Sequence, residues 1–161
     1  MPYSVLFVCL GNICRSPLAE AAFKQEVHKR NLPIHVESAG IGPWHINQPP
    51  DPRAIRQASQ HGIDIRHYKG RQINATDFLN FSHIIAMDKK NIAQLVKLAP
   101  KMHRSSIKLF MDYVPDHKQD EIPDPYYGDE KDFQKTWEQV SLGAFHLANY
   151  FEELILKNSV L

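Results

Sequence analysis

The stretch between residues 5 and 24 constrains the fold more than any other part of this chain. An apolar run at residues 5–8 leads directly into a short loop that begins with Cys9 and ends with Arg15. Ser16 and Pro17 follow, and an amphipathic segment continues through residues 18–24. This order predicts a buried strand, a tight loop and the first turns of a helix. A chain built from such strand-to-helix steps is expected to form a parallel sheet.

The chemistry of residues 9–15 indicates a site for a tetrahedral oxyanion. Backbone N–H groups of such a loop turn inward, and the helix N-terminus adds positive potential. Arg15 offers a planar fork to two phosphate oxygens. A thiol has an ordinary pKa near 8.5, which a helix N-terminus and a neighbouring cation lower. We therefore expect Cys9 to be a nucleophile toward phosphate, and the residues between it and Arg15 to bind the substrate: Leu10, Gly11, Asn12, Ile13 and Cys14.

Individual residues of the loop favour this interpretation. Gly11 permits a backbone angle that brings the amides round, and Asn12 tolerates the left-handed region. Ser16 is expected to cap the helix and to lie close enough to donate to the Cys9 sulfur, and Pro17 suits the first helical turn. The alternative is that Cys9 is simply a buried residue at the end of a strand, as free cysteines commonly are.

Composition predicts one compact cytoplasmic domain that spans residues 1–161. The chain is 43% hydrophobic and carries a formal charge of +1, which provides no bulk attraction to nucleic acid or to a membrane surface. The N-terminal apolar run is too short for a signal peptide or a membrane span. Only two cysteines occur, and both lie in one loop, so no secreted disulfide framework is expected. The histidines are scattered without ligand spacing, and no metal site is predicted.

Strand-like and helix-like segments alternate along the chain, which predicts an α/β fold with a parallel four-stranded sheet. Strands are expected at residues 3–8, 34–38, 81–87 and 107–110, and helices at residues 17–30, 51–60 and 89–98. The last helix is marked by an apolar stripe with alternating spacings of four and three, which predicts core packing: Phe133, Trp137, Val140, Ala144, Leu147, Phe151 and Leu154.

The irregular stretch at residues 112–128 is expected to be a surface loop that carries function. It contains several candidates for a proton donor: Asp112, Asp116, Asp120, Glu121 and Asp124. Only Asp124 lies between two prolines, which restrict the backbone, and Tyr126 and Tyr127 follow it as flat walls suited to an aryl ring. By turn chemistry alone, an Asp at this place more often serves only to form the turn.

These motifs together resemble the low-molecular-weight protein tyrosine phosphatase family. Beyond residues 9–17, the resemblance continues through nearly the whole chain, at Ser38-Ala39-Gly40, Trp44, Asp51-Pro52-Arg53-Ala54, His67, Arg71-Gln72, Met87-Asp88 and Asp124-Pro125-Tyr126-Tyr127-Gly128. It implies a doubly wound, open α/β domain with helices on both faces of the sheet. It also implies hydrolysis of a tyrosine-phosphorylated protein through a phosphocysteine, without metal or cofactor, with Asp124 as general acid and then as base.

The resemblance also implies supporting roles outside the loop. Ser38 and His67 are expected to hydrogen-bond to Asn12 and to fix its backbone, although the residues alone leave His67 as an ordinary solvated histidine. Trp44 is expected at the rim of the pocket, with plain packing as the alternative. The chain departs from the family at His45-Ile46-Asn47, because many members carry a glycine at the Asn47 position. This departure leaves substrate preference open.

Three other functions are compatible with parts of the pattern. A thioredoxin-coupled arsenate reductase shares the fold and the anion loop, but it needs further cysteines, and none follows Cys14. A phosphocysteine carrier of a sugar-uptake system should lack a general acid such as Asp124. A non-catalytic phosphotyrosine-binding module would have no need of Cys9, Arg15 and Asp124 together. Cys14 is further expected to protect Cys9 by forming a disulfide under oxidation.

Overall fold

The computed structural model describes residues 3–103 and 105–159, and its centre is a parallel sheet. The four strands are β1 (Tyr3–Cys9), β2 (Ile34–Gly40), β3 (His83–Ala86) and β4 (Ser106–Leu109), in the order β2-β1-β3-β4. The chain runs from β1 to β2 on one side and then crosses back to β3 on the other. Ligands of open α/β sheets bind at such a switch point, beyond the carboxyl ends of the strands.

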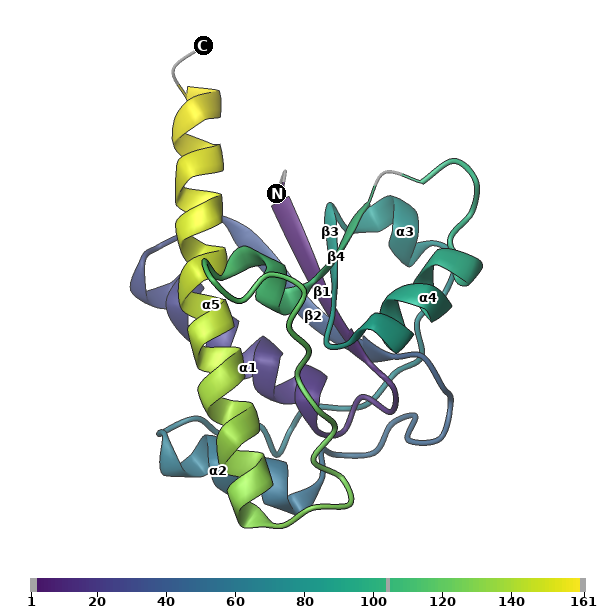
Figure 1. The fold of residues 1–161 in the computed structure, drawn as a ribbon, viewed down its shortest axis with the longest axis vertical. Coiled ribbons are helices and arrows are strands. Elements are labelled where there is room, and N and C mark those ends of the chain that lie inside the picture. The colour runs from purple at the N-terminus through teal and green to yellow at the C-terminus, as the bar shows by residue number, and fades with distance from the viewer. Residues whose placement is uncertain (1–2, 104, 160–161) are drawn as a thin grey trace.

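Helices cover both faces of the sheet, as expected for a doubly wound domain (Figure 1). The helices are α1 (Arg15–Lys29), α2 (Pro52–Gln60), α3 (Asp77–Asn80), α4 (Lys89–Leu98) and α5 (Glu130–Ser159), with a 3-10 turn, η1 (Phe110–Tyr113). None of the helices within the described residues has the length and apolar character needed to cross a membrane.

The side-chain alternation of β1 divides the core in two. Val5 and Phe7 point to the face covered by α1, α2 and α5, whereas Leu6 and Val8 point to the face covered by α3 and α4. All four side chains are fully buried, which explains why this strand reads as a continuous apolar run in the sequence.

Helix α5 packs its apolar stripe into one of the two cores, as predicted. Six of the seven stripe residues are buried: Phe133, Trp137, Val140, Ala144, Leu147 and Phe151. Gly143 lies on the same side of the helix, where there is no room for a side chain: a Cβ would stand 2.8 Å from the Phe110 ring. The helix runs along the whole domain, and its C-terminal turns extend past the sheet (Figure 1).

Several element boundaries differ from those expected. Helix α1 begins at Arg15 rather than at Pro17, and its N-cap residue, Cys14, makes no side-chain capping bond. The predicted capping role of Ser16 is therefore wrong, because Ser16 lies inside the helix. Strand β3 is shorter than expected, and Phe110 belongs to η1. Helix α3 was not expected, because one turn is too short to carry a periodic pattern.

Candidate active site

The loop at residues 9–15, called the anion loop below, leaves the carboxyl end of β1 and wraps around the Cys9 sulfur. The backbone N–H of Asn12 donates to Cys9 Sγ at 3.3 Å, and Ser16 Oγ lies 3.1 Å from the same sulfur. Asn12 has a φ of 60°, in the left-handed region, as expected. Gly11 does not: among the described glycines, only Gly62 has a positive φ.

Gly11 instead packs closely against a neighbouring side chain. A Cβ at Gly11 would stand 3.3 Å from the His45 ring, so His45 would have to shift by a few tenths of an ångström. We expected Gly11 to supply the unusual backbone angle of the loop, but Gly11 does not have a positive φ. The left-handed turn that aims the amides inward is made by Asn12, a residue type that accepts this conformation better than most.

Arg15 is buried and held from several directions, with 2% of its surface exposed. Its Nη1 donates to Asp88 Oδ2 at 2.6 Å and to the carbonyl of Ile122 at 2.9 Å, while Nη2 lies 3.6 Å from Asp124 Oδ2. Burial opposes the charge, but Cys9, Asp88 and Asp124 together raise the pKa of the guanidinium. The cation is thus permanent and fixed in direction, and it is coupled electrostatically to both the thiol and the acid.

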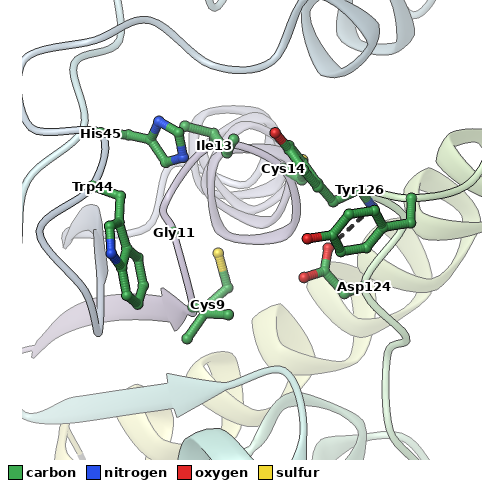
Figure 2. Close-up of a pocket in the computed structure, with 10 residues that line it drawn as sticks. Cys9, Gly11, Ile13, Cys14, Trp44, His45, Asp124 and Tyr126 are labelled. Atoms are coloured by element: carbon green, nitrogen blue, oxygen red, sulfur yellow. Dashed lines mark hydrogen bonds between the residues drawn. The ribbon is translucent and has the colours of Figure 1, made fainter.

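Asp124 lies beside Tyr126, across the cavity from Trp44, and the Cys9 sulfur lies between the two sides (Figure 2). Its Oδ1 accepts the backbone N–H of Tyr126 at 3.1 Å, so the carboxylate closes its own turn. The side chain keeps 39% of its surface exposed, which leaves the other oxygen accessible from the cavity. The turn-forming and acid roles are therefore compatible, because they use different oxygens.

The cavity has a volume of about 300 Å³ and flat aromatic walls. Trp44 and Tyr126 stand on opposite sides of it, with the Cys9 sulfur between them (Figure 2). The Trp44 ring lies on the backbone of Gly42, where a Cβ would stand 1.9 Å from it. The structure brings these predicted residues together around the cavity: Cys9, Leu10, Gly11, Ile13, Cys14, Trp44, Asp124, Tyr126 and Tyr127.

Two residues of the anion loop, Asn12 and Arg15, do not line the cavity, and the Asn12 side chain lies beneath the loop. Its Nδ2 donates to Ser16 Oγ at 2.8 Å and to Ser38 Oγ at 3.0 Å. Its Oδ1 accepts the backbone N–H of Arg71 at 3.0 Å. Asn12 therefore supports the loop through its side chain and contributes only its backbone N–H to the anion site.

The expected hydrogen bond from His67 to Asn12 is wrong. His67 is exposed and packs edge-on against Tyr68, with ring centroids 5.0 Å apart. No hydrogen bond in the described part of the chain joins His67 to Asn12. The His67 ring packs in solvent against Tyr68, and the Arg71 N–H takes the place of His67 at the Asn12 oxygen.

Two residues that tie the site together were not predicted. Asp88, which orients Arg15, follows β3 and also caps α4 by accepting the Asn91 N–H at 2.7 Å. Asp88 could have been predicted from its place just after a parallel strand, because the carboxyl ends of such strands meet at the sheet edge where Cys9 lies. Arg53 donates to the carbonyl oxygens of Tyr126 at 2.9 Å and Gly128 at 3.0 Å, and so holds the loop at residues 124–128 against α2.

The loop at His45-Ile46-Asn47, where the chain departs from the family, borders the cavity. His45 lines the wall, and its Nδ1 lies 2.9 Å from Gln48 Oε1. Asn47 has a φ of 64°, a conformation that suits glycine, so its side chain is tolerated where a glycine would be unstrained. Cys14 is buried, and burial first, then the nearby Cys9, raise the pKa of its thiol, which therefore stays protonated.

Comparisons with known proteins agree with this geometry. Residues 4–158 match the family model described as low molecular weight phosphotyrosine protein phosphatase. A Saccharomyces cerevisiae protein of that name is 39% identical over 98% of this chain and 95% of its own length. The structure of YfkJ from Bacillus subtilis superposes with a TM-score of 0.87 at 40% identity, covering 94% of this chain and 95% of YfkJ.

A further solved structure, Vibrio vulnificus Wzb in complex with benzylphosphonate, has a TM-score of 0.81 at 27% identity and covers 92% of this chain and 98% of its own. Agreement in sequence over nearly the full length, together with agreement in fold, is far more than the loop motif alone would require. The chain belongs to the low molecular weight phosphotyrosine protein phosphatases, which are hydrolases of phosphoric monoesters.

Proposed function

We propose that this protein removes phosphate from tyrosine-phosphorylated proteins through a phosphocysteine intermediate on Cys9. The observation that carries the proposal is a thiol and a carboxylate that line one cavity, with a fixed guanidinium buried beside the carboxylate. Arg15 Nη2 lies 3.6 Å from Asp124 Oδ2, and Cys9 and Asp124 both line the cavity. A nucleophile, an oxyanion-binding cation and a proton donor are the groups that a two-step hydrolysis needs.

In the first step, the anion-loop amides and Arg15 bind the non-bridging oxygens of the phosphate. The Cys9 thiolate attacks phosphorus in line, forming a sulfur–phosphorus bond as the bond to the phenolic oxygen breaks. Asp124 gives its proton to that leaving oxygen, so a neutral tyrosine departs. The thiolate accepts hydrogen bonds from the Asn12 N–H and from Ser16, which keeps its lone pair directed into the cavity.

In the second step, the phosphocysteine is hydrolysed. Asp124, now ionised, takes a proton from a water that attacks phosphorus, and the bond to sulfur breaks. Phosphate leaves, and both the Cys9 thiolate and the protonated Asp124 are regenerated. The loop stabilises the equatorial oxygens in both transition states without rearranging.

The shape of the cavity favours an aryl phosphate over an alkyl one. Trp44 and Tyr126 form flat walls on either side of the nucleophile, which suits a planar ring inserted between them (Figure 2). The Vibrio vulnificus relative was solved with benzylphosphonate, a ligand that also joins an aromatic ring to a tetrahedral anion.

Phosphate release from a phosphotyrosine peptide tests the proposal. Wild-type protein should turn over repeatedly with no metal added, while Cys9→Ser should release no phosphate and still bind the peptide, because its hydroxyl is not ionised near neutral pH. Rapid acid quenching of wild type should trap phosphate on Cys9. A single stoichiometric burst would indicate a carrier, and no release at all a binding module. Arsenate turnover with thioredoxin would indicate a reductase.

A further inference from the structure

A continuous hydrogen-bond chain connects the Cys9 sulfur to a buried carboxylate on α1. Cys9 Sγ lies 3.1 Å from Ser16 Oγ, which accepts from Asn12 Nδ2 at 2.8 Å. Asn12 Nδ2 also donates to Ser38 Oγ at 3.0 Å, and Ser38 Oγ donates to Glu20 Oε1 at 2.6 Å. Glu20 does not line the cavity, and its residue is only 8% exposed.

Two groups, the Arg71 N–H and the Glu20 carboxylate, determine the directions of the hydrogen bonds around Asn12 and Ser38. The Arg71 N–H can only donate, so it holds Asn12 Oδ1 and turns both Nδ2 protons toward Ser16 and Ser38. An ionised carboxylate can only accept, so the Ser38 hydroxyl donates to Glu20 and must accept from Asn12.

The hydroxyl proton of Ser16 is the one donor of this network that is not directed by Arg71 or Glu20. The Ser16 oxygen already accepts from Asn12, and a thiolate carries no proton, so the Ser16 O–H points at Cys9 Sγ. The negative charge of Glu20 thus stands at the far end of a chain whose near end is a hydrogen bond donated to the nucleophile.

Glu20 is paired with a cation on its own helix. Its Oε2 accepts from Lys24 Nζ at 2.6 Å, and that ammonium lies 5.0 Å from the centre of the Tyr68 ring. Burial first, and then the charge of Glu20, raise the pKa of the Tyr68 phenol, which therefore stays neutral. Glu20 is faced by Lys24 from its own helix, by Ser38 from β2 and by Tyr68 from the loop after α2.

We propose that Glu20 is a positioning residue for the nucleophile, which acts on Cys9 through Ser38, Asn12 and Ser16. The inference rests on the proposed function, because it assigns Glu20 a role toward the reacting thiolate. A neutral amide in place of Glu20 presents donors as well as an acceptor. The Ser38 hydroxyl is then no longer forced to donate outward, and an N–H donated by the new amide competes with Asn12 Nδ2 for the Ser38 oxygen. Asn12 keeps its hydrogen bond from Arg71 but is held less firmly on the Ser38 side, which weakens the position of Ser16.

A plain helix-stabilising role for Glu20 is the alternative, and α1 contains a matched example of it. Glu26 also pairs with a cation four residues on, Arg30, at 2.9 Å, but among the described contacts it touches no residue of the anion loop. Glu26→Gln therefore removes an ion pair of the same spacing on the same helix and leaves the hydrogen-bond chain intact. It is the control for Glu20→Gln.

The sign of the effect separates positioning from simple electrostatics. Removing a negative charge would by itself favour the Cys9 thiolate and speed its alkylation. Loss of the hydrogen bond donated by Ser16 should slow it instead. Iodoacetamide labelling at pH 6 reports on Cys9, because the buried Cys14 stays protonated.

We expect Glu20→Gln to slow both Cys9 alkylation and kcat for a phosphotyrosine peptide by about tenfold, with KM changed less. Ser38→Ala should cause a similar loss, and the double variant should lose no more than Ser38→Ala alone. Glu26→Gln should stay within about twofold of wild type. Unchanged or faster alkylation in Glu20→Gln, or losses that multiply in the double variant, would overturn the proposal.

If Glu20→Gln does not fold, Glu20→Asp replaces it, because it keeps the charge and shortens the reach. Glu20→Asp should show a smaller loss of alkylation rate and kcat, and this loss should disappear in the Ser38→Ala background. A loss that persists in that background would contradict the proposed hydrogen-bond connection from Glu20 to Cys9. Alkylation needs no turnover, so the two proposals fail separately. If Cys9→Ser retains phosphatase activity, the proposed function fails. If only the effect of Glu20 is absent, this inference fails.

Discussion

Asp124→Asn is the substitution that most directly tests the proton-transfer step. The asparagine keeps an oxygen for the Tyr126 N–H, which Asp124 Oδ1 accepts at 3.1 Å, so the turn should survive. It has no proton to give to a leaving phenol at neutral pH. General acid–base catalysis contributes about 10²–10⁴-fold. The variant should therefore lose kcat by that factor on phosphotyrosine, which corresponds to about 2.7–5.4 kcal/mol in the barrier.

The same substitution should hardly affect folding. Asp124 lies 3.6 Å from Arg15, but 39% of the Asp124 side chain is exposed. A partly solvated pair of this kind contributes about 0–1 kcal/mol to the free energy of unfolding. For a chain of this size, that shifts Tm by about 4 °C at most. A large loss of rate with an almost unchanged melting temperature is thus the expected signature.

The assay compares substrates with poor and good leaving groups. The loss should be full for phosphotyrosine and should shrink for an aryl phosphate whose phenolate departs without a proton. Asp120→Asn is the matched control, because Asp120 belongs to the same loop but lies 2.9 Å from His117 and does not line the cavity. Equal losses on both substrates would refute the acid role, and leaving-group dependence in Asp120→Asn would move the role to that residue.

Three other outcomes are expected. Arg15→Lys should lower kcat/KM by about 10²–10³-fold in steady-state assays, because an ammonium lacks the planar fork that binds two phosphate oxygens while Asp88 holds the guanidinium. Peroxide-treated wild type should recover activity with dithiothreitol, whereas Cys14→Ser should not, since Cys14 is needed to trap oxidised Cys9 as a disulfide; a peptide map without that disulfide would contradict this. Burial, and then the charge of Lys108, lowers the pKa of His83 to about 4, below its unfolded value of 6.5. As the pH drops from 6.5 toward 4, the unfolded chain therefore binds a proton that the folded protein does not, and the free energy of unfolding falls. Thermal melts should show this loss, about 3 kcal/mol in the free energy of unfolding, and His83→Gln should flatten it.

The local parts of the fold and site followed from the sequence, because their partners are neighbours along the chain. The apolar run before Cys9 predicted a buried strand, and the loop that follows it was expected to wrap the thiol. Asn12 was placed correctly in the left-handed region, since few residue types tolerate it. The stripe of α5 was identified by its period, because one helical face must be buried.

The tertiary structure decided which distant groups complete the site. Asn12 Oδ1 is held by the Arg71 N–H and not by His67, and Arg15 is oriented by Asp88, a residue 73 positions away. Glu20 was read only as part of an amphipathic helix. Periodicity and propensity report which face of an element is buried, but hydrogen bonds form only between atoms about 3 Å apart. The sequence therefore specified the nucleophile and its loop, whereas the groups that aim them depend on how the strands and helices pack.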